Sequence, residues 1–332
     1  MSAPNDIILF HYPFSPFAKR VVWYLTLRQI PYAQCLQPAT LPRPDLSQLG
    51  ISYRRIPILS LGKSIYCDTR LILSKLDAAF PHSNLSPPSV EQTAIRKLLE
   101  SWTIDGGIFA RAAQSLPPDL PIMKDATFTK DREAYTGRSW SQESVSALRP
   151  EALVHIRSAF DELENGLLAD GRAWILNTAE PGSADIDTIW PFHWLIGLKV
   201  ALPKQLISSQ SHPRVFAWCD RFDEAIKRAK ASIPKPVTLK GEEAASFIKS
   251  ASLPHVEFGA DPVFEGDPTG LKPGMMVESW PTDSGFRNKD RGKLVKLNKQ
   301  ECVIENEMGL RIHHPRWNFR VNRVEEGREA KL

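Results

Sequence analysis

The chain has few cysteines and no long apolar run. Its 332 residues include four cysteines, Cys35, Cys67, Cys219 and Cys302, which lie far apart and form neither a C-x-x-C pair nor a metal-ligand pattern. This spacing indicates reduced, buried thiols. No apolar run approaches membrane-spanning length, and the first residues lack the basic and apolar regions of a signal peptide. We therefore expect a cytoplasmic protein that makes no membrane contact.

The chain also has little net charge. Its 42 basic and 38 acidic residues leave +4, which is too balanced to indicate a nucleic-acid partner. The charge is unevenly distributed, because residues 1–80 carry 9 Lys/Arg against 4 Asp/Glu, whereas residues 255–332 carry 13 of each. An excess of positive charge in the N-terminal part suits a small anionic ligand.

Three stretches of different character predict three domains: an α/β domain over 1–82, an all-helical domain over 89–252 and a small β module over 258–326. In the first stretch, short apolar runs alternate with helix-like segments. They predict strands at 7–11, 32–36, 57–61 and 64–67, helices at 16–29 and 69–79, and an irregular proline-rich segment at 38–50. The clearest linker is 80–88, which is rich in proline and serine.

The middle stretch has the apolar periodicity of helices from 89 to about 250. Within it, 115–150 is too long for an ordinary helix–helix connection and is either partly helical or a functional loop. After Pro254, short alternating runs at 275–280, 292–297, 301–305, 310–313 and 319–321 are separated by turn residues. They predict a small antiparallel module with a barrel-like form.

The beginning of the first predicted helix has the features of an anion site. Ser15 stands at the N-cap position and Pro16 at the first helical position, where its missing N–H costs nothing. A hydroxyl, free backbone N–H groups and the positive end of the helix dipole therefore meet just beyond the first strand. Such a site suits an anion such as a thiolate.

Two further motifs follow in the same domain. Ile56-Pro57 precedes an apolar strand, and a cis bond there would expose the backbone of Ile56 to a peptide-like ligand, although a trans turn proline is the commoner case. Asp68-Thr69 ends one strand and begins a helix. In isolation this pair is most simply a helix N-cap.

Together these motifs resemble the glutathione transferase family. A strand–Ser-Pro-Phe–helix unit, a proline before an apolar strand and an Asp-Thr helix cap occur in the order and spacing of its thioredoxin-like domain. The stretch from Phe14 to Arg20 resembles the F-C-P-F-A-x-R motif of omega-class enzymes, with Ser15 in place of cysteine. Gly182-Ser183-Ala184-Asp185 resembles the family's S/T-x-A-D motif before its core helix. The resemblance does not cover 115–150 or the β module.

The resemblance implies a glutathione site in which Ser15 stabilises the thiolate. Lowering a thiol pKa from ~8.5 by about two units needs roughly 2.7 kcal/mol. A charge-assisted hydrogen bond supplies about 1.5–3 kcal/mol and a helix terminus about 0.3–2 kcal/mol, so a general base is not required. By the same resemblance, Asp68 meets the α-amino group of glutathione, Thr69 its α-carboxylate and the Ile56 backbone its central peptide.

The rest of the expected site also follows from the resemblance. Arg54 or Arg55 would meet the glycyl carboxylate, and Phe17 and Pro57 complete the glutathione-binding set. Tyr12 is a competing catalytic hydroxyl, although packing beneath Pro13 is the simpler and favoured explanation. His11 points to the opposite face of its strand and is expected to be a core or edge residue.

The electrophile would meet the first long helix of the second domain. Trp102, Asp105, Phe109 and Arg111 are candidates by position, although helix-spaced aromatic residues usually belong to the core. The stretch 128–133 would either cover the cleft as a lid or cap the helices. No metal is expected, because His313 and His314 have no supporting ligands near them in the sequence.

The sequence thus predicts a glutathione-dependent transferase or isomerase that acts on a small hydrophobic electrophile and forms a homodimer. The insert and the β module suggest a specialised substrate, as in secondary metabolism, rather than general detoxification. The alternative is a non-catalytic scaffold or regulatory protein whose β module binds a partner. In that case, truncation at Pro254 should abolish partner binding and leave the remainder folded. Nucleic acid is not the expected partner, although Arg311, Arg316, Trp317, Phe319 and Arg320 could form a basic aromatic patch.

Overall fold

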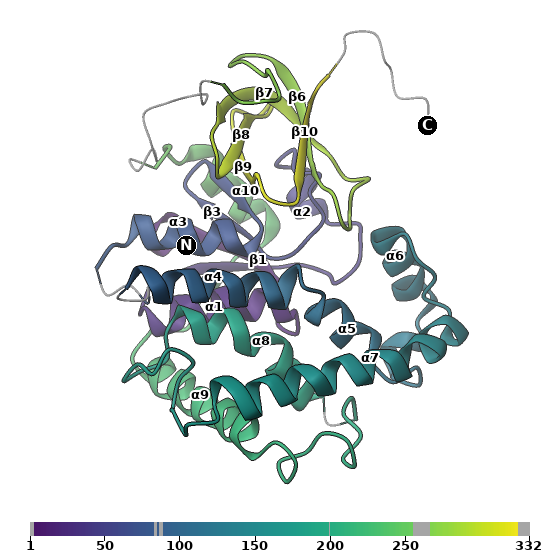
Figure 1. Cartoon of the computed structure of the whole chain (residues 1–332). Helices are drawn as coiled ribbons and strands as arrows, with labels where there is room; N and C mark the ends of the chain where they lie inside the picture. Colours follow the sequence, from purple (N-terminus) through teal and green to yellow (C-terminus); the bar gives the residue numbers. More distant parts are fainter. Residues whose placement is uncertain (1–2, 83–84, 86–88, 199, 255–265, 325–332) are drawn as a thin grey trace.

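The computed structural model of the chain describes residues 3–82, 85, 89–198, 200–254 and 266–324. Figure 1 shows an N-terminal α/β region between a helical region and a curled set of C-terminal strands. No helix in the described ranges is long and apolar enough to cross a membrane. The linker predicted at 80–88 and the predicted start of the β module at 258 lie partly outside the described residues.

The N-terminal region has the predicted alternation of strands and helices. Its elements are the short 3₁₀ turn η1 (Pro4–Asp6), β1 (Ile7–His11), α1 (Pro16–Leu27), β2 (Ala33–Leu36), α2 (Pro44–Ser47), β3 (Ile58–Leu61), β4 (Ser64–Cys67) and α3 (Thr69–Ala79). The bounds predicted for β1, β4 and α3 are confirmed. The segment expected to be irregular contains α2, a single helical turn with Pro44 at its first position.

β1 forms the centre of this region because it is apolar on both faces. It pairs in parallel with β2 and antiparallel with β3, and all five of its residues are buried. Successive side chains point to opposite faces of the sheet. Ile7 and Leu9 join the apolar core beneath the helices, whereas Ile8 and Phe10 join the core on the other side of the sheet.

The helical region packs against one face of the N-terminal sheet. Its elements are α4 (Val90–Ile104), α5 (Ile108–Gln114), the 3₁₀ turn η2 (Pro121–Lys124), α6 (Ala126–Thr136), α7 (Gln142–Glu162), the π-helical turn η3 (Leu163–Leu167), α8 (Ser183–Gly197) and α9 (Pro213–Ala231). α8 lies in the core, with Trp190 fully buried. The stretch 115–150 is therefore partly helical, and α6 stands apart from the bundle (Figure 1).

After α9 the chain returns to the N-terminal sheet, which the sequence did not predict. β5 (Val237–Thr238) pairs in parallel with β2, and α10 (Gly241–Ser250) packs against α2. Gly241 is required at that contact because a Cβ there would lie 1.9 Å from an Asp45 carboxylate oxygen. β5 thus extends the sheet at its edge, and α10 adds apolar residues to the core on the sheet face opposite the helical region.

The C-terminal strands are antiparallel to one another, as predicted. They are β6 (Met276–Pro281), β7 (Asp290–Leu297), β8 (Glu301–Glu305), β9 (Arg311–Pro315) and β10 (Phe319–Arg323), and they curl into a barrel-like form (Figure 1). They do not form an independent unit, because β9 pairs in parallel with β4. The described strands consequently make one ten-stranded sheet in the order β10-β6-β7-β8-β9-β4-β3-β1-β2-β5.

Candidate functional site

Strand register brings the three predicted motifs to one end of the sheet. Phe10 of β1 is opposite Ile58 of β3, and Ile58 is opposite Cys67 of β4. Because β3 is antiparallel to both neighbours, the residues that follow β1, precede β3 and follow β4 all lie at the same end of these strands. Ser15, Ile56-Pro57 and Asp68-Thr69 are therefore near neighbours although they are far apart in the sequence.

Ser15 caps α1 as predicted. Its hydroxyl oxygen accepts a hydrogen bond from the Ala18 backbone N–H at 3.2 Å, and the side chain is almost wholly buried. Its backbone N–H donates to the Tyr12 carbonyl at 3.1 Å, which holds the turn between β1 and α1. The Ser15 hydroxyl thus sits at the positive end of α1, where a thiolate would be stabilised.

The second candidate hydroxyl, Tyr12, adjoins the first. Burial raises the pKa of Tyr12, while the positive charges of Arg132 and Arg43 and a hydrogen bond with Ser15 act in the opposite direction without overcoming it. Tyr12 is therefore protonated at neutral pH and can serve as a hydrogen-bond donor. His11 pairs with Gln34 at 2.9 Å, and burial lowers the pKa of this histidine, consistent with the predicted core position.

The Ile56–Pro57 peptide bond is cis. Among the described residues, no hydrogen bond involves the backbone N–H or C=O of Ile56. That backbone therefore has the capacity to pair with a peptide-like ligand. Phe17 is less accessible, because its ring packs between Phe109 at 4.7 Å and Trp190 at 4.5 Å between centroids.

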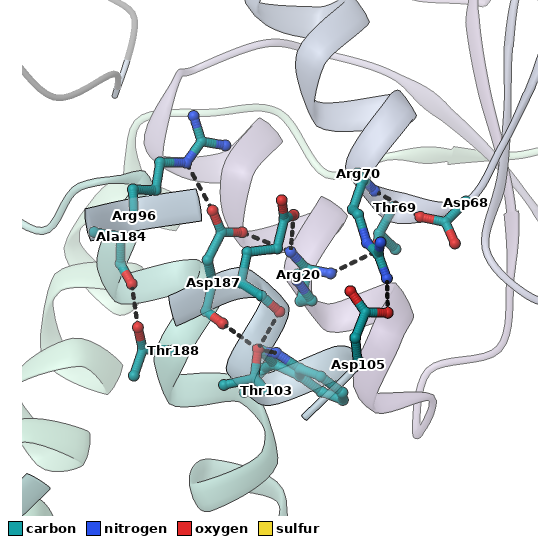
Figure 2. A network of polar contacts seen from close by, with 12 residues as sticks. Arg20, Asp68, Thr69, Arg70, Arg96, Thr103, Asp105, Ala184, Asp187 and Thr188 are labelled. Carbon is teal, nitrogen blue, oxygen red and sulfur yellow. Dashed lines mark hydrogen bonds and ion pairs between the residues drawn. The ribbon is translucent and has the colours of Figure 1, made fainter. Parts of the chain in front are cut away.

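Asp68 and Thr69 play different parts at the start of α3. Asp68 accepts the Arg70 backbone N–H at 3.0 Å and has a φ of 71°, a conformation that side-chain-bearing residues rarely adopt. Such strain is concentrated at ligand sites. Asp68 is partly exposed, whereas Thr69 is buried and its hydroxyl accepts a hydrogen bond from Arg20 at 2.5 Å. Figure 2 shows both residues beside this arginine.

Arg20 supports the candidate site through a buried network of charged side chains. Its guanidinium donates to Asp187 at 2.6 Å and to Glu100 at 2.8 Å, and Arg96 donates to the other Asp187 oxygen at 2.7 Å (Figure 2). Burial by itself raises the pKa of Asp187, but the charges of Arg96 and Arg20 outweigh burial and lower it. The network ties α1, α3, α4 and α8 together beneath the candidate site.

Arg54 and Arg55 are both paired with acidic residues of this chain. Arg54 donates to Asp131 of α6 at 2.7 Å. Arg55 forms an ion pair with Asp283 and donates to the Ser284 carbonyl at 2.7 Å, in the loop between β6 and β7. The sequence analysis did not identify either aspartate as a site residue, although 128–133 was recognised as a possible cover.

Asp105 lies close to the start of α3, where it contacts Arg70 and the turn between β9 and β10. Its carboxylate accepts hydrogen bonds from Arg70 at 2.7 Å, Trp317 Nε1 at 2.9 Å and Asn318 Nδ2 at 2.6 Å. Figure 2 places Arg70 and Asp105 beside Asp68 and Thr69. The turn between β9 and β10 therefore reaches the end of the sheet at which the three motifs meet.

The other electrophile candidates occupy different surroundings. The Trp102 ring packs on Phe192 at 5.8 Å, and Phe109 packs on Trp190 at 5.0 Å, so both contribute to the core against α8. Arg111 instead pairs with Glu151 of α7 at 2.8 Å. An open groove of ≈ 500 Å³ on α7 contains none of these residues. Their role toward an electrophile stays a prediction.

The two C-terminal histidines have acidic partners that the sequence did not suggest. His314 pairs with Asp290 at 2.9 Å, and Cys67 lies close enough that one potential ligand atom from each residue falls within 4.8 Å of the others. Asp290 also accepts the backbone N–H groups of Ser52 at 2.5 Å and Tyr53 at 3.1 Å. The Asp290 carboxylate therefore has several hydrogen-bond donors around it, and it connects β7 to the segment before Pro57.

The cysteines and the basic patch have mainly structural surroundings. All four cysteines are free and buried. Burial is the main reason why the pKa of Cys67 is raised, so this thiol is protonated. In the possible basic aromatic patch, Arg316 pairs with Asp267 at 2.6 Å and Trp317 donates to Asp105. These two side chains are therefore engaged within the chain.

Comparison with known proteins agrees with this geometry. Residues 9–87 match the family described as glutathione S-transferase, N-terminal domain, and residues 111–231 match a domain of unknown function (DUF7962). A probable glutathione S-transferase of Solanum tuberosum is 26% identical over 94 residues, which are 28% of this chain. The match spans 43% of that relative's length.

Solved structures extend the likeness to the fold. A GST-like protein from Pseudomonas syringae has a TM-score of 0.67 at 22% identity and covers 96% of this chain and 100% of its own. A glutathione S-transferase from Sinorhizobium meliloti has a TM-score of 0.51 at 18% identity and covers 70% and 95%. A rice glutathione S-transferase solved with glutathione has a TM-score of 0.50 at 16% identity. The match covers 73% of this chain and 96% of the rice chain.

The fold is a thioredoxin-like domain followed by a helical domain, with an additional antiparallel β region. Residues 9–87 match the glutathione S-transferase N-terminal domain, and the fold of the chain is similar to that of the solved GST-like and glutathione S-transferase structures. The Pseudomonas structure covers 96% of this chain, whereas the Sinorhizobium and rice structures cover 70% and 73%.

Proposed function

We propose that the protein is a glutathione-dependent transferase or isomerase acting on a small hydrophobic electrophile. The observation that carries this proposal is the meeting of three groups at one end of the sheet: the Ser15-capped start of α1, the Ile56 backbone, which has no hydrogen-bond partner among the described residues, and the partly exposed carboxylate of Asp68. These are a thiolate stabiliser, a peptide-pairing segment and a partner for an amino group, respectively.

Ser15 acts on the sulfur of the bound peptide. Its oxygen accepts the Ala18 N–H, which leaves the hydroxyl proton to be donated to Tyr12 or, when the peptide is bound, to its sulfur. A hydrogen bond to the thiolate, together with the helix terminus, lowers the thiol pKa toward neutral pH. Tyr12 adds a second protonated hydroxyl beside Ser15. The thiolate then attacks the electrophile; sulfur stays on the product in conjugation and leaves again in isomerisation.

The remaining contacts select the peptide. Asp68 pairs with the α-amino group of glutathione, and the first N–H groups of α3 bind its α-carboxylate. The Ile56 backbone pairs with the cysteinyl peptide group. A homodimer and a cytoplasmic location belong to the same proposal. Because β9 already pairs with the outer edge of β4, the dimer contact would involve other surfaces.

The first experiment is calorimetric titration of the full chain with reduced glutathione. We expect micromolar-to-millimolar binding that Asp68→Ala abolishes, with Asp170→Ala, an exposed aspartate outside the site, as the matched control. Ser15→Ala should retain binding but lose turnover of an aryl halide electrophile, while stability falls by only about 0.5–2 kcal/mol from the lost cap.

Two results would contradict this proposal. Absence of glutathione binding by the intact protein would favour the scaffold alternative, in which the fold serves another ligand or a partner. Undiminished turnover by Ser15→Ala would remove the assignment of Ser15 and leave Tyr12 as the hydroxyl to test.

A further inference from the structure

Arg54 and Arg55, which would receive the glycyl carboxylate of glutathione in the proposed site, are already paired with carboxylates of the chain itself. Asp131 accepts the Arg54 guanidinium at 2.7 Å, a side-chain bond from Arg132 and the Leu41 backbone N–H at 3.0 Å. The side chains of Arg54 and Asp131 are 5% and 9% exposed. The pair is therefore nearly buried and well supplied with hydrogen bonds.

The loop between β6 and β7 closes over the same pair. The Gly285 backbone N–H donates to the Tyr135 carbonyl of α6 at 2.8 Å, and the Arg54 guanidinium lies 5.0 Å from the centre of the Tyr135 ring. Gly285 has a φ of +69°, and a Cβ there would lie 3.1 Å from Arg54 Cγ. In the same loop Asp283 pairs with Arg55.

We propose that Asp131 and, to a lesser degree, Asp283 make the site select a γ-glutamyl-cysteinyl-glycyl thiol whose glycyl carboxylate is masked as an ester or amide. This inference rests on the proposed function and deepens it by naming the ligand class. Both residues belong to parts of the chain, the insert and the β region, that lie outside the matched N-terminal domain.

The physical reason is competition between carboxylates for the same guanidinium groups. A free glycyl carboxylate must either share the Arg54 guanidinium with Asp131 or displace Asp131 from it, and an uncompensated buried carboxylate is costly. If Asp131 stays in place, the ligand's negative charge approaches another negative charge in a poorly solvated site. A neutral C-terminus avoids both penalties. Asp283 has a smaller effect because 55% of its side chain is exposed.

The test compares ligands that differ only at this end. Calorimetry on the full chain would use glutathione, its glycyl monoethyl ester and its glycyl amide. We expect the wild type to bind the ester and the amide at least as tightly as glutathione. Asp131→Asn keeps the shape and removes the charge, so it should tighten glutathione binding at least tenfold relative to the ester. Asp283→Asn should produce a smaller change in the same direction.

Asp125→Asn is the matched control, because Asp125 caps the same helix and is exposed. Asparagine is an equally good N-cap, so this variant should leave the ligand preference unchanged. Thermal unfolding of each variant checks that it folds, and the wild-type comparison decides the question even if Asp131→Asn does not.

The inference is overturned if wild type binds glutathione more than tenfold tighter than the ester, or if folded Asp131→Asn changes both affinities equally. Measurable but weaker binding of glutathione than of the ester would support it. Failure of all three ligands to bind wild type would overturn the proposed glutathione function and this inference together.

Discussion

Glu301 at the start of β8 connects the C-terminal strands to the N-terminal region. Its carboxylate accepts bonds from Lys75 of α3 at 2.8 Å and Lys296 of β7 at 3.2 Å, and it pairs with His313 at 3.0 Å. Burial by itself raises the pKa of Glu301, but His313 and Lys75 outweigh it and lower the pKa to about 2. The folded pKa therefore lies below the unfolded value near 4.5.

This difference predicts acid sensitivity. The carboxylate stabilises the fold above about pH 4.5, and the contribution is lost as pH falls toward 2. By the linkage relation, the Glu301 carboxylate contributes about 3 kcal/mol to the free energy of unfolding at neutral pH. Of this contribution, about 2 kcal/mol is lost between pH 6 and pH 3. In urea unfolding, Glu301→Gln should be destabilised at neutral pH and show a flatter dependence on pH. Exposed Glu307→Gln is the control, and a wild-type slope in Glu301→Gln would contradict the prediction.

The residues that sequence alone identified are those whose roles are local. Ser15 is an N-cap because of the residues that follow it, and Asp68 caps α3 in the same way. Asp131 and Asp283 could not be found like this. They meet Arg54 and Arg55 across 77 and 228 residues, and nothing in their neighbouring sequence encodes that distance.

The four helices that meet at Arg20 depend on one buried guanidinium. Arg20 lies on α1 and reaches Thr69, Glu100 and Asp187 on three other helices. It is fully buried, as is Asp187. Such a network is stable only when each charge keeps its partners.

We predict that Arg20→Met lowers the free energy of unfolding by about 3–5 kcal/mol, because it leaves buried carboxylates short of positive charge. Urea unfolding measures this as a lower midpoint with a similar slope. Arg157→Met on the exposed side of α7 is the control and should change stability by less than about 0.5 kcal/mol. An Arg20→Met midpoint equal to that of the control would show that the network contributes little.

The elements with a strong periodic pattern were predictable, and the weakly patterned ones were not. β1 and α3 follow directly from an apolar run and a capped amphipathic stretch. β5 has only Val237 and Thr238 and no pattern of its own, and it exists because β2 offers a parallel partner. The pairing of β9 with β4 was missed for the same reason, since register between distant strands is a tertiary property.

The shared sheet changes what removal of the C-terminal strands should do. The sequence suggested that a chain ending at Pro254 stays folded. Truncation at Pro254 would instead remove β9. Ser64, Ile65 and Tyr66 of β4 would then lose the strand with which they pair on that side. Truncation would also expose one side of a core cluster that contains Ile58 and Ile65 together with Ile304 and Ile312.

We therefore predict that the fragment 1–254 aggregates or unfolds at a clearly lower urea concentration than the full chain, which should unfold in one cooperative transition. Size-exclusion chromatography and urea unfolding of both proteins provide the measurement. A soluble monomeric fragment with the full-length midpoint would show that the strands after Pro254 form an independent domain.

Joining two sets of strands into one sheet also limits self-association. A sheet edge with free N–H and C=O groups is a template for aggregation. In the described part of the chain, the sheet ends at β5, which is two residues long, and at β10, where Arg320 and Arg323 are exposed. One edge is too short to recruit another chain and the other repels a copy of itself, so concentrated solutions should resist edge-to-edge fibre growth for as long as β4 remains covered.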